Sequence, residues 1–225
     1  MASDQPAGRN PPRREAARRG VCLVIAAPSG AGKSTIAAAL SRSEPELRTS
    51  VSVTTRAPRG GEVEGREYLF RSREQFDAMA QAGELLEWAV VFGRGYGTPR
   101  APVERWLAEG CDVLFDIDWQ GYRQIRAALP GDVVGLFVLP PSLEVLEARL
   151  RRRAADDAAE IARRMAAARD EISHWAEFDY VLVNASLERS VSEARAVLHA
   201  ARLATGRQRD VRALAARLGP DPVAR

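Results

Sequence analysis

The sequence predicts an α/β fold in which helices cover both faces of a parallel sheet. Short continuous apolar runs alternate with amphipathic segments along most of the 225 residues, and a loop of small residues follows the first run. Continuous apolar runs are typical of strands buried on both faces, and their alternation with helices favours right-handed crossovers between parallel strands. We therefore expect a three-layer core, interrupted by a mixed α/β insert over residues 50–98.

The expected elements of the core follow in order along the chain. The apolar runs predict strands at 21–27, 112–118, 133–139 and 180–183. Segments of helical period, several with Pro, Ser or Gly at their ends, predict helices at 34–42, 102–110, 141–153, 156–178 and 187–203. Within the insert we expect strands at 50–56, 66–70 and 85–92 and a helix at 73–83. Residues 206–225 are expected to be a polar tail with a weak helix and no assigned role.

The composition excludes several classes of protein. Apolar residues make up 46% of the chain and charged residues 28%, which suits a single soluble domain. Cys22 and Cys111 lie in or beside apolar runs, so we expect buried thiols rather than a disulfide or a metal pair. Since the chain has only two histidines and two cysteines, no transition-metal site is expected.

The amino-terminal segment and the hydropathy pattern bear on location. No run approaches the roughly 20 apolar residues of a membrane span, and the Pro- and Arg-rich residues 1–19 lack the apolar centre of a secretory signal. We expect residues 1–19 to be a disordered basic tail of a cytoplasmic protein. A nucleic-acid-binding arm is the less favoured alternative, so neither a nucleic acid nor a membrane is expected as a partner. The oligomeric state is left open.

The loop "AAPSGAGKST", residues 26–35, has the pattern of a phosphate-binding loop. Small residues let backbone N–H groups approach phosphate oxygens, and the following helix adds its positive dipole end. The pattern G-x-x-x-x-G-K-[ST] is met except that Ala27 replaces the first glycine. Alanine with positive φ would cost about 1–2 kcal/mol, so we expect an ordinary backbone there. The predicted ATP-binding residues of this loop are Ala27, Pro28, Ser29, Gly30, Ala31, Gly32, Lys33, Ser34 and Thr35.

A magnesium ion is the cofactor that this loop implies. In such loops the lysine, here Lys33, reaches the β- and γ-phosphates, and the hydroxyl that follows it, here Ser34, ligates Mg²⁺. Asp116 ends a buried strand, which is where a P-loop NTPase core places the acidic residue of the Mg²⁺ shell. The sequence therefore predicts Mg²⁺ bound together with ATP, with Ser34 and Asp116 as its protein ligands.

Four separated blocks together resemble the guanylate kinase family. They are "APSGAGKST", "TTRAPRGGEVEGREYLF", "LLEWAVVFGRGYGT" and "DIDWQG", and the resemblance runs from about residue 21 to 203. It implies phosphoryl transfer from ATP to GMP, giving ADP and GDP, with dGMP as an expected second acceptor. It also implies a P-loop NTPase core (20–49, 99–150 and 175–205), a GMP-binding subdomain (50–98) and a helical lid (151–174).

The resemblance further implies which residues bind and react. Those expected to bind the GMP phosphate are Arg56, Arg59, Tyr68 and Tyr96. Those expected around the guanine are Ser52, Glu87, Thr98 and Asp118. Those expected in catalysis are Lys33, Arg59, Arg153 and Arg164. Asn184 matches an adenine-side contact, so it joins the ATP-binding set.

These residue types fit the chemistry. Two unit charges of like sign repel by about 4 kcal/mol at 4 Å and an effective dielectric of 20, so arginines and Mg²⁺ must offset the repulsion between two facing phosphates. Guanine presents two N–H donors that the carboxylate of Glu87 accepts, whereas adenine lacks that pair. A site built on such hydrogen bonds can discriminate by about 10⁴-fold.

Two alternatives and one ambiguity remain at this stage. The alternatives are a catalytically inactive, guanylate-kinase-like protein-binding module and a kinase of another phosphorylated acceptor such as ribose 1,5-bisphosphate. The intact Lys33–Ser34 pair disfavours the first, and the presence of Glu87 and Ser52 disfavours the second.

The family often has Gly beside the first lid arginine and paired acids after the last strand, where this chain has "RRRAA", Ala185 and Ser186. Neighbouring arginines could replace those assigned to the lid: Arg149, Arg151, Arg152 and Arg163.

Overall fold

A five-stranded parallel sheet forms the centre of the computed structural model, which describes residues 18–153 and 158–219. The strand order is β2-β7-β1-β8-β9, and each pair is parallel. The bounds are β1 (Cys22–Ala26), β2 (Leu47–Thr49), β7 (Asp112–Asp116), β8 (Val133–Leu139) and β9 (Tyr180–Val183). The expected α/β fold with a parallel sheet is confirmed.

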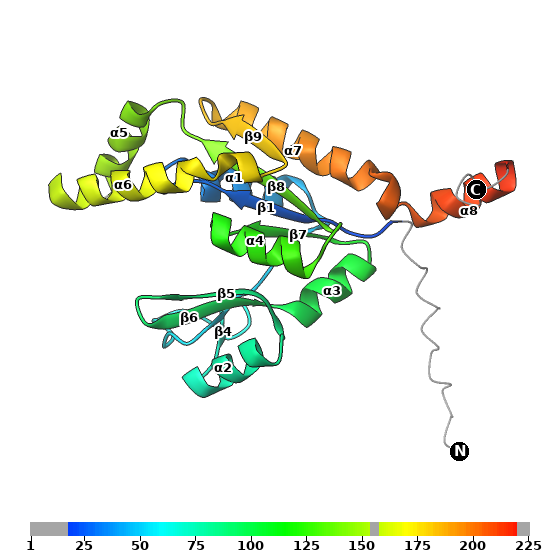
Figure 1. Ribbon diagram of the computed structural model, residues 1–225, viewed down its shortest axis with the longest axis horizontal. Coiled ribbons are helices and arrows are strands. Elements are labelled where there is room, and N and C mark those ends of the chain that lie inside the picture. The colour runs from blue at the N-terminus through cyan, green and yellow to red at the C-terminus, as the bar shows by residue number, and fades with distance from the viewer. Residues whose placement is uncertain (1–17, 154–157, 220–225) are drawn as a thin grey trace, which may run out of the picture.

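Helices cover both faces of this sheet (Figure 1). Alternate residues of β1 explain the two layers, because Leu23 and Ile25 pack into one apolar cluster while Cys22 and Val24 pack into the other. The first cluster includes α1 (Lys33–Ser43) and α7 (Leu187–Leu203), and the second includes α3 (Arg100–Ala108) and α4 (Trp119–Ala128). Burial on both faces is the reason why the β1 segment is apolar throughout.

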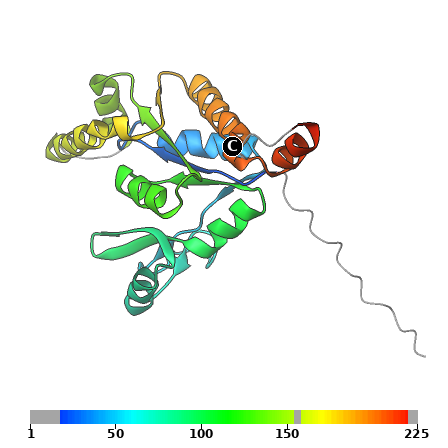
Figure 2. The same cartoon turned by 45° about the vertical axis from the view of Figure 1, so that its right-hand side comes forward.

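The insert forms a second, smaller sheet on the side of α3 and α4 (Figure 2). Its order is β4-β3-β6-β5, with only the β3–β4 pair parallel. The bounds are β3 (Val53–Thr54), β4 (Leu69–Phe70), β5 (Leu85–Val91) and β6 (Arg94–Pro99). The helix α2 (Arg73–Gln81) begins at a capping box, in which Ser72 and Gln75 each accept a backbone N–H, and it packs Phe76 against this sheet.

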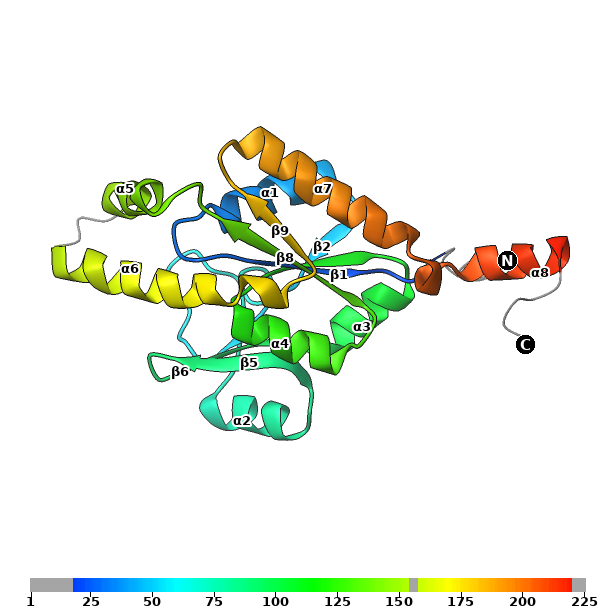
Figure 3. The ribbon, with the colours of Figure 1, turned by 45° about the horizontal axis from the view of Figure 1, so that its top comes forward.

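Two helices extend beyond the end of the central sheet where β1 turns into α1 (Figure 3). They are α5 (Leu143–Arg153) and α6 (Ala158–Ser173), and they share a small apolar cluster that includes Leu146, Leu150 and Ile161. The helix expected over 156–178 ends at Ser173, and a short 3₁₀ helix, Trp175–Glu177, follows it. Within the described residues, none of the helices combines the length and the apolar character that a membrane span requires.

The two predicted tails are wrong at their inner ends. Arg18 pairs with the fully buried Asp112 at 2.7 Å, and Arg19 pairs with Asp132 at 2.6 Å, so neither belongs to a disordered segment. Arg207 is 5% exposed and donates to the carbonyl oxygens of Gly20 and Gly131. The helix α8 (Arg209–Leu218) then extends beyond the opposite end of the sheet from α5 and α6 (Figure 1). The predicted disorder of residues 1–17 lies outside the described residues.

Candidate functional site

The loop between β1 and α1 needs glycine at two positions. Gly30 and Gly32 have φ values of +92° and +103°, in the left-handed region. A Cβ on Gly32 would lie 2.3 Å from Nδ2 of Asn184, so steric contact excludes any other residue there as well. Ala27 has no positive φ, since Phe92 is the single non-glycine residue with one in the described part of the chain. The expectation of an ordinary backbone at Ala27 is confirmed.

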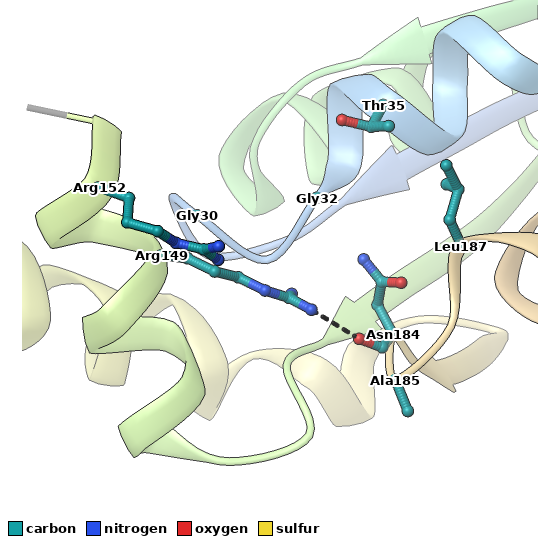
Figure 4. A pocket seen from close by; sticks show the side chains of 8 residues that line it. All are labelled: Gly30, Gly32, Thr35, Arg149, Arg152, Asn184, Ala185 and Leu187. Carbon is teal, nitrogen blue, oxygen red and sulfur yellow. Dashed lines mark hydrogen bonds between the residues drawn. The ribbon is translucent and has the colours of Figure 1, made fainter.

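Asn184 and Arg149 hold this loop from the other side (Figure 4). Nδ2 of Asn184 donates to the carbonyl oxygen of Ala31 at 2.7 Å, and its Oδ1 accepts from the Ser190 hydroxyl at 3.0 Å. Arg149 donates to the same Ala31 oxygen at 3.2 Å and to the backbone oxygen of Asn184 at 3.1 Å. The side chain of Asn184, which we expected beside adenine, is therefore engaged in shaping the loop.

A cavity of about 380 Å³ opens beside the loop. Its lining combines the two glycines with side chains from α1, α5 and the segment after β9: Gly30, Gly32, Thr35, Arg149, Arg152, Asn184, Ala185 and Leu187 (Figure 4). Arg149 and Arg152 are three residues apart on α5, so they share a helix face. That spacing is the sequence signal by which Arg152, rather than Arg151, could have been placed at this cavity.

The first turn of α1 is open to an anion. Gly32 is its N-cap and supplies no side-chain hydrogen bond, and no acidic residue lies in the first turn. The unpaired N–H groups and the helix dipole therefore favour a phosphate there. Nζ of Lys33 lies 2.9 Å from Oδ1 of Asp116 and 2.8 Å from the carbonyl oxygen of Ile117, which fixes the ammonium group where β7 ends.

Ser34 and Asp116 fit a magnesium ion shared with a nucleotide. Ser34 is exposed in the first turn of α1, and the carboxylate of Asp116 lies 2.9 Å from the ammonium group of Lys33, the residue before it. The described residues contain no cluster of three or more His, Cys, Asp or Glu that could hold a metal by themselves. Mg²⁺ commonly takes one or two protein ligands and completes its shell with phosphate oxygens and water, so this donor set suits it.

The helix α6 contacts the loop through Ser29. The Ser29 hydroxyl accepts from Nη2 of Arg164 at 3.2 Å, and its backbone N–H donates to Glu171 at 3.2 Å. Burial raises the pKa of Glu171, and the bond from Ser29 opposes that shift. Arg153 is the last residue of α5, and its side chain lies outside the described residues. Arg164 is thus placed beside the phosphate loop, while the side chain of Arg153 is not located.

A buried acid lies in the small sheet. Glu87 and Thr98 face each other across β5 and β6, and the Thr98 hydroxyl donates to Oε1 of Glu87 at 2.6 Å. Glu87 is 9% exposed. Burial raises the pKa of its carboxyl, the Thr98 bond opposes this, and the charge of Asp118 raises it further. A ligand that donates N–H groups would therefore find a desolvated carboxylate here.

Two other residues expected around a purine base lie close to this acid. Asp118 caps α4, accepting the backbone N–H of Gly121 at 2.8 Å, and its charge acts on Glu87. Ser52 directly precedes β3, in which Val53 pairs with Gly97. The same antiparallel register, continued by one residue, puts Ser52 beside Thr98.

The arginine side of the small sheet forms a second cavity of about 380 Å³. Arg56 donates to Glu62 at 2.7 Å and to the carbonyl oxygen of Ala57 at 2.8 Å. Its guanidinium carbon lies 5.2 Å from the centre of the Tyr68 ring, and Tyr68 packs edge-on against Tyr96. The residues that line this cavity come from the β3–β4 connection and the β5–β6 hairpin: Arg56, Ala57, Arg59, Val91, Phe92, Arg94 and Tyr96.

Glu62 organises the two arginines that the sequence assigned to a phosphate. Its Oε1 accepts from the side chain of Arg56, and its Oε2 accepts from the backbone N–H of Arg59 at 2.7 Å. The Arg56 guanidinium and the Arg59 N–H hold the pKa of Glu62 below its ordinary value. The side chain of Arg59 is exposed at the cavity. Glu62 is a site residue that was not predicted, and the only sequence signal for it is its position inside the block "TTRAPRGGEVEGREYLF".

Comparison with known proteins identifies the relatives of this chain. Residues 19–201 match the family model described as guanylate kinase. The chain is 70% identical over 194 residues to a guanylate kinase of Gluconobacter oxydans, covering 86% of this chain and 93% of that one. It is 64% identical to one of Granulibacter bethesdensis, covering 88% and 92%. The crystal structure of guanylate kinase from Anaplasma phagocytophilum superposes with a TM-score of 0.69 at 38% identity, covering 89% and 95%.

Proposed function

The chain belongs to the guanylate kinase family, and on that premise we propose that it transfers the γ-phosphoryl group of ATP to GMP, giving ADP and GDP. The resemblance seen in the sequence is confirmed by these relatives. One observation carries the assignment to this chain: the phosphate loop with Lys33 and the buried Glu87–Thr98 pair occur in the same molecule. The protein-binding module and the kinase of another acceptor are not favoured.

We infer that ATP binds along the loop between β1 and α1. The N–H groups of the first α1 turn face the phosphates, and Lys33 contributes the positive charge that the β- and γ-phosphates require. Mg²⁺, when bound with ATP, neutralises phosphate charge, and Ser34 and Asp116 are its proposed protein ligands. Asn184 and Arg149 keep the Ala31 carbonyl turned away from the phosphates, because both donate to it.

GMP is proposed to lie along the small sheet. Arg56, Arg59, Tyr68 and Tyr96 surround its phosphate, and the rings of the two tyrosines lie 6.2 Å apart beside Arg56. The acceptor oxygen is already anionic, so the reaction needs no general base. The arginines instead offset the repulsion between the two nucleotides and stabilise charge on the transferring group.

Guanine recognition is assigned to Glu87, with Thr98, Ser52 and Asp118 around it. Thr98 occupies one carboxylate oxygen of Glu87 and thereby fixes its orientation. The ionised carboxylate accepts the two N–H groups of guanine, whereas adenine would leave it buried without those donors. Because the assigned residues recognise base and phosphate, we expect dGMP to be accepted as well.

Arg164 and Arg153 are proposed to approach the transferring phosphoryl group from the lid. Arg164 already contacts Ser29 of the loop. Arg149 and Arg152 line the ATP-side cavity, so they are proposed to contact the donor phosphates rather than the acceptor. A closed lid would also exclude water, which otherwise competes as the phosphoryl acceptor.

A coupled assay of ADP release tests the function. The full chain with MgATP is given GMP, dGMP, AMP or no acceptor, and we expect rapid release only with the two guanine nucleotides. Equal release with AMP and GMP contradicts the role of Glu87. Release that does not depend on any acceptor, or none with any of them, contradicts the proposed kinase reaction.

A further inference from the structure

Arg94 is a third arginine at the phosphate side of the small sheet. It begins β6, directly opposite Val91, and lines the same cavity as Arg56 and Arg59. Neither the phosphate loop nor the blocks that assigned the GMP site gave it a role. Its position therefore calls for an explanation in terms of the cavity that it lines.

The register of β6 puts Arg94 in line with the residues assigned to GMP. Arg94, Tyr96 and Thr98 alternate along the strand, so they lie on one face. Thr98 belongs to the guanine pocket with Glu87, and Tyr96 lies beside the phosphate-binding residues. The order along this face is base, then phosphate, then Arg94, which matches a mononucleotide lying along the strand with its phosphate toward the hairpin.

The charges of the cavity also point to Arg94. Arg56 is paired with Glu62 at 2.7 Å, and Glu62 also accepts the backbone N–H of Arg59. The other two cations that line the cavity are Arg59 and Arg94. A phosphate monoester carries close to two negative charges above its second pKa, which is about 6. The charges of Arg56, Arg59 and Glu62 sum to +1, and Arg94 raises the sum to +2, which matches the phosphate.

The guanidinium of Arg94 is available for a ligand. In residues 18–153 and 158–219, no carboxylate or carbonyl oxygen accepts a hydrogen bond from it. Its backbone is nevertheless fixed, because the two-residue turn before it has φ values of +49° at Phe92 and +75° at Gly93. Such turns hold hairpin strands in a defined register. The side chain is thus anchored at the cavity and has hydrogen-bond donors to offer.

We propose that Arg94 is a third cationic ligand of the acceptor phosphate and strengthens the binding of GMP. This inference rests on the proposed function of the small sheet. Arg94 adds charge at the end of the acceptor that is remote from the guanine pocket. It therefore acts mainly on acceptor affinity, and it leaves the binding of ATP unchanged.

The test compares Arg94→Gln and Arg94→Lys with the wild-type chain and with Arg73→Gln. Arg73 is an exposed arginine of α2 in the same subdomain, paired with Asp77, so its replacement makes the same change in net charge away from the cavity. We measure kcat, the KM for GMP and for ATP, the thermal unfolding midpoint, and the Kd of GMP by calorimetry.

We expect Arg94→Gln to raise the KM and Kd of GMP about tenfold, which corresponds to about 1.4 kcal/mol. Its kcat should change less than threefold, and its KM for ATP should stay the same. Arg94→Lys should recover most of the loss, and Arg73→Gln should match the wild type. The proposal is overturned by a change below twofold in Arg94→Gln, by an equally impaired Arg94→Lys, or by a parallel rise in the KM for ATP. If the wild-type chain releases no ADP with GMP, the proposed function fails, and the calorimetric Kd still decides the role of Arg94.

Discussion

Thr98 donates a 2.6 Å hydrogen bond to Glu87 across β5 and β6, and both residues are buried. The bond holds one carboxylate oxygen in place while burial disfavours its charge. A carboxylate in that state gains most from a ligand that supplies further N–H donors. On the proposed function, this arrangement lets Glu87 discriminate guanine from adenine.

Glu87→Gln should abolish the preference for GMP. The amide loses the charge that strengthens both hydrogen bonds to guanine, and each bond to a charged group contributes about 1.5–3 kcal/mol. We expect kcat/KM for GMP to fall by about 100-fold or more, with little change for AMP. Steady-state assays with both acceptors check this, and the exposed Glu84→Gln is the matched control. An unchanged ratio between GMP and AMP would remove Glu87 from the guanine site.

The same substitution should stabilise the protein in the absence of nucleotide. The pKa of Glu87 is raised in the folded state, so folding favours its protonated form. The stability that this contributes is present below the unfolded pKa, about 4.3, and is lost as the pH rises through the folded value. Denaturant unfolding should therefore give Glu87→Gln a larger free energy of unfolding than the wild type at pH 7.5 but not at pH 4. An equal difference at both values would contradict the sign of the shift.

Lys33→Met should affect turnover far more than GMP binding. Lys33 is paired with Asp116 at the end of β7 in the central sheet, and the proposed function gives its charge a role at the transferring phosphoryl group. We expect a fall in kcat of about 100-fold to 1,000-fold and a Kd for GMP within threefold of wild type. Comparable losses in both would show that Lys33 acts mainly in assembling the site.

Lys33 is also the sole lysine of the sequence, which permits a direct chemical test. An amine-reactive reagent has no other lysine side chain to modify. Mass spectrometry of the peptide that contains Lys33 therefore reports how accessible its amine is to the reagent. We expect MgATP to protect Lys33 and GMP alone to leave it reactive. Protection by GMP and not by MgATP would reverse the assignment of the two nucleotide sites.

Gly32→Ala should impair the ATP site through backbone strain and through a clash with Asn184. The variant Gly61→Ala introduces the backbone strain without the clash. Both glycines have positive φ, but only at Gly32 would a Cβ meet Asn184, at 2.3 Å, while the space around Gly61 is open. The strained backbone should lower stability by about 1–2 kcal/mol in each variant. The KM for ATP should rise at least about tenfold only in Gly32→Ala. Equal effects in both variants would mean that the contact with Asn184 carries no weight.

Arg207→Met should destabilise the fold without altering the active site. It removes hydrogen bonds to Gly20 and Gly131 at 2.7 and 2.9 Å and leaves Asp132 with one cation fewer. Breaking such a buried pair destabilises by about 3–5 kcal/mol. The exposed Arg217→Met should stay within about 0.5 kcal/mol of wild type. Denaturant unfolding measures the free energy of unfolding of both variants. A loss at Arg207 no larger than that at Arg217 would mean that the buried contacts of Arg207 do not stabilise the fold.

The central strands could be predicted because their pattern follows from burial. The apolar runs at 133–139 and 180–183 match β8 and β9 at both ends, since strands covered on two faces need apolar residues throughout. The strand β2 was missed because it has only three residues, and one of them is buried. The helix α4 was also missed, with Gly121 in its first turn.

The strand β6 shows why a local pattern can mislead. Its glycines suggest a turn, yet Gly97 is required because a Cβ there would lie 2.9 Å from the Glu87 carbonyl oxygen. That close approach is a property of the paired strands and is invisible in the segment alone. The phosphate loop was predictable because its chemistry is contiguous, whereas the guanine site was reached only through the family resemblance. Arg94 belongs to no sequence motif, so it could be identified only from the cavity that it lines in the structure.

Gln124 of α4 holds the backbone of Trp88 on both sides, accepting its N–H at 3.0 Å and donating to its carbonyl oxygen at 3.1 Å. An amide side chain thus mimics an adjacent strand at the residue that follows Glu87. A rotation of the small sheet relative to the central sheet must break both of these hydrogen bonds or move α4 as well. The residue that follows Glu87 is consequently tied to a helix of the central core through both of its backbone groups.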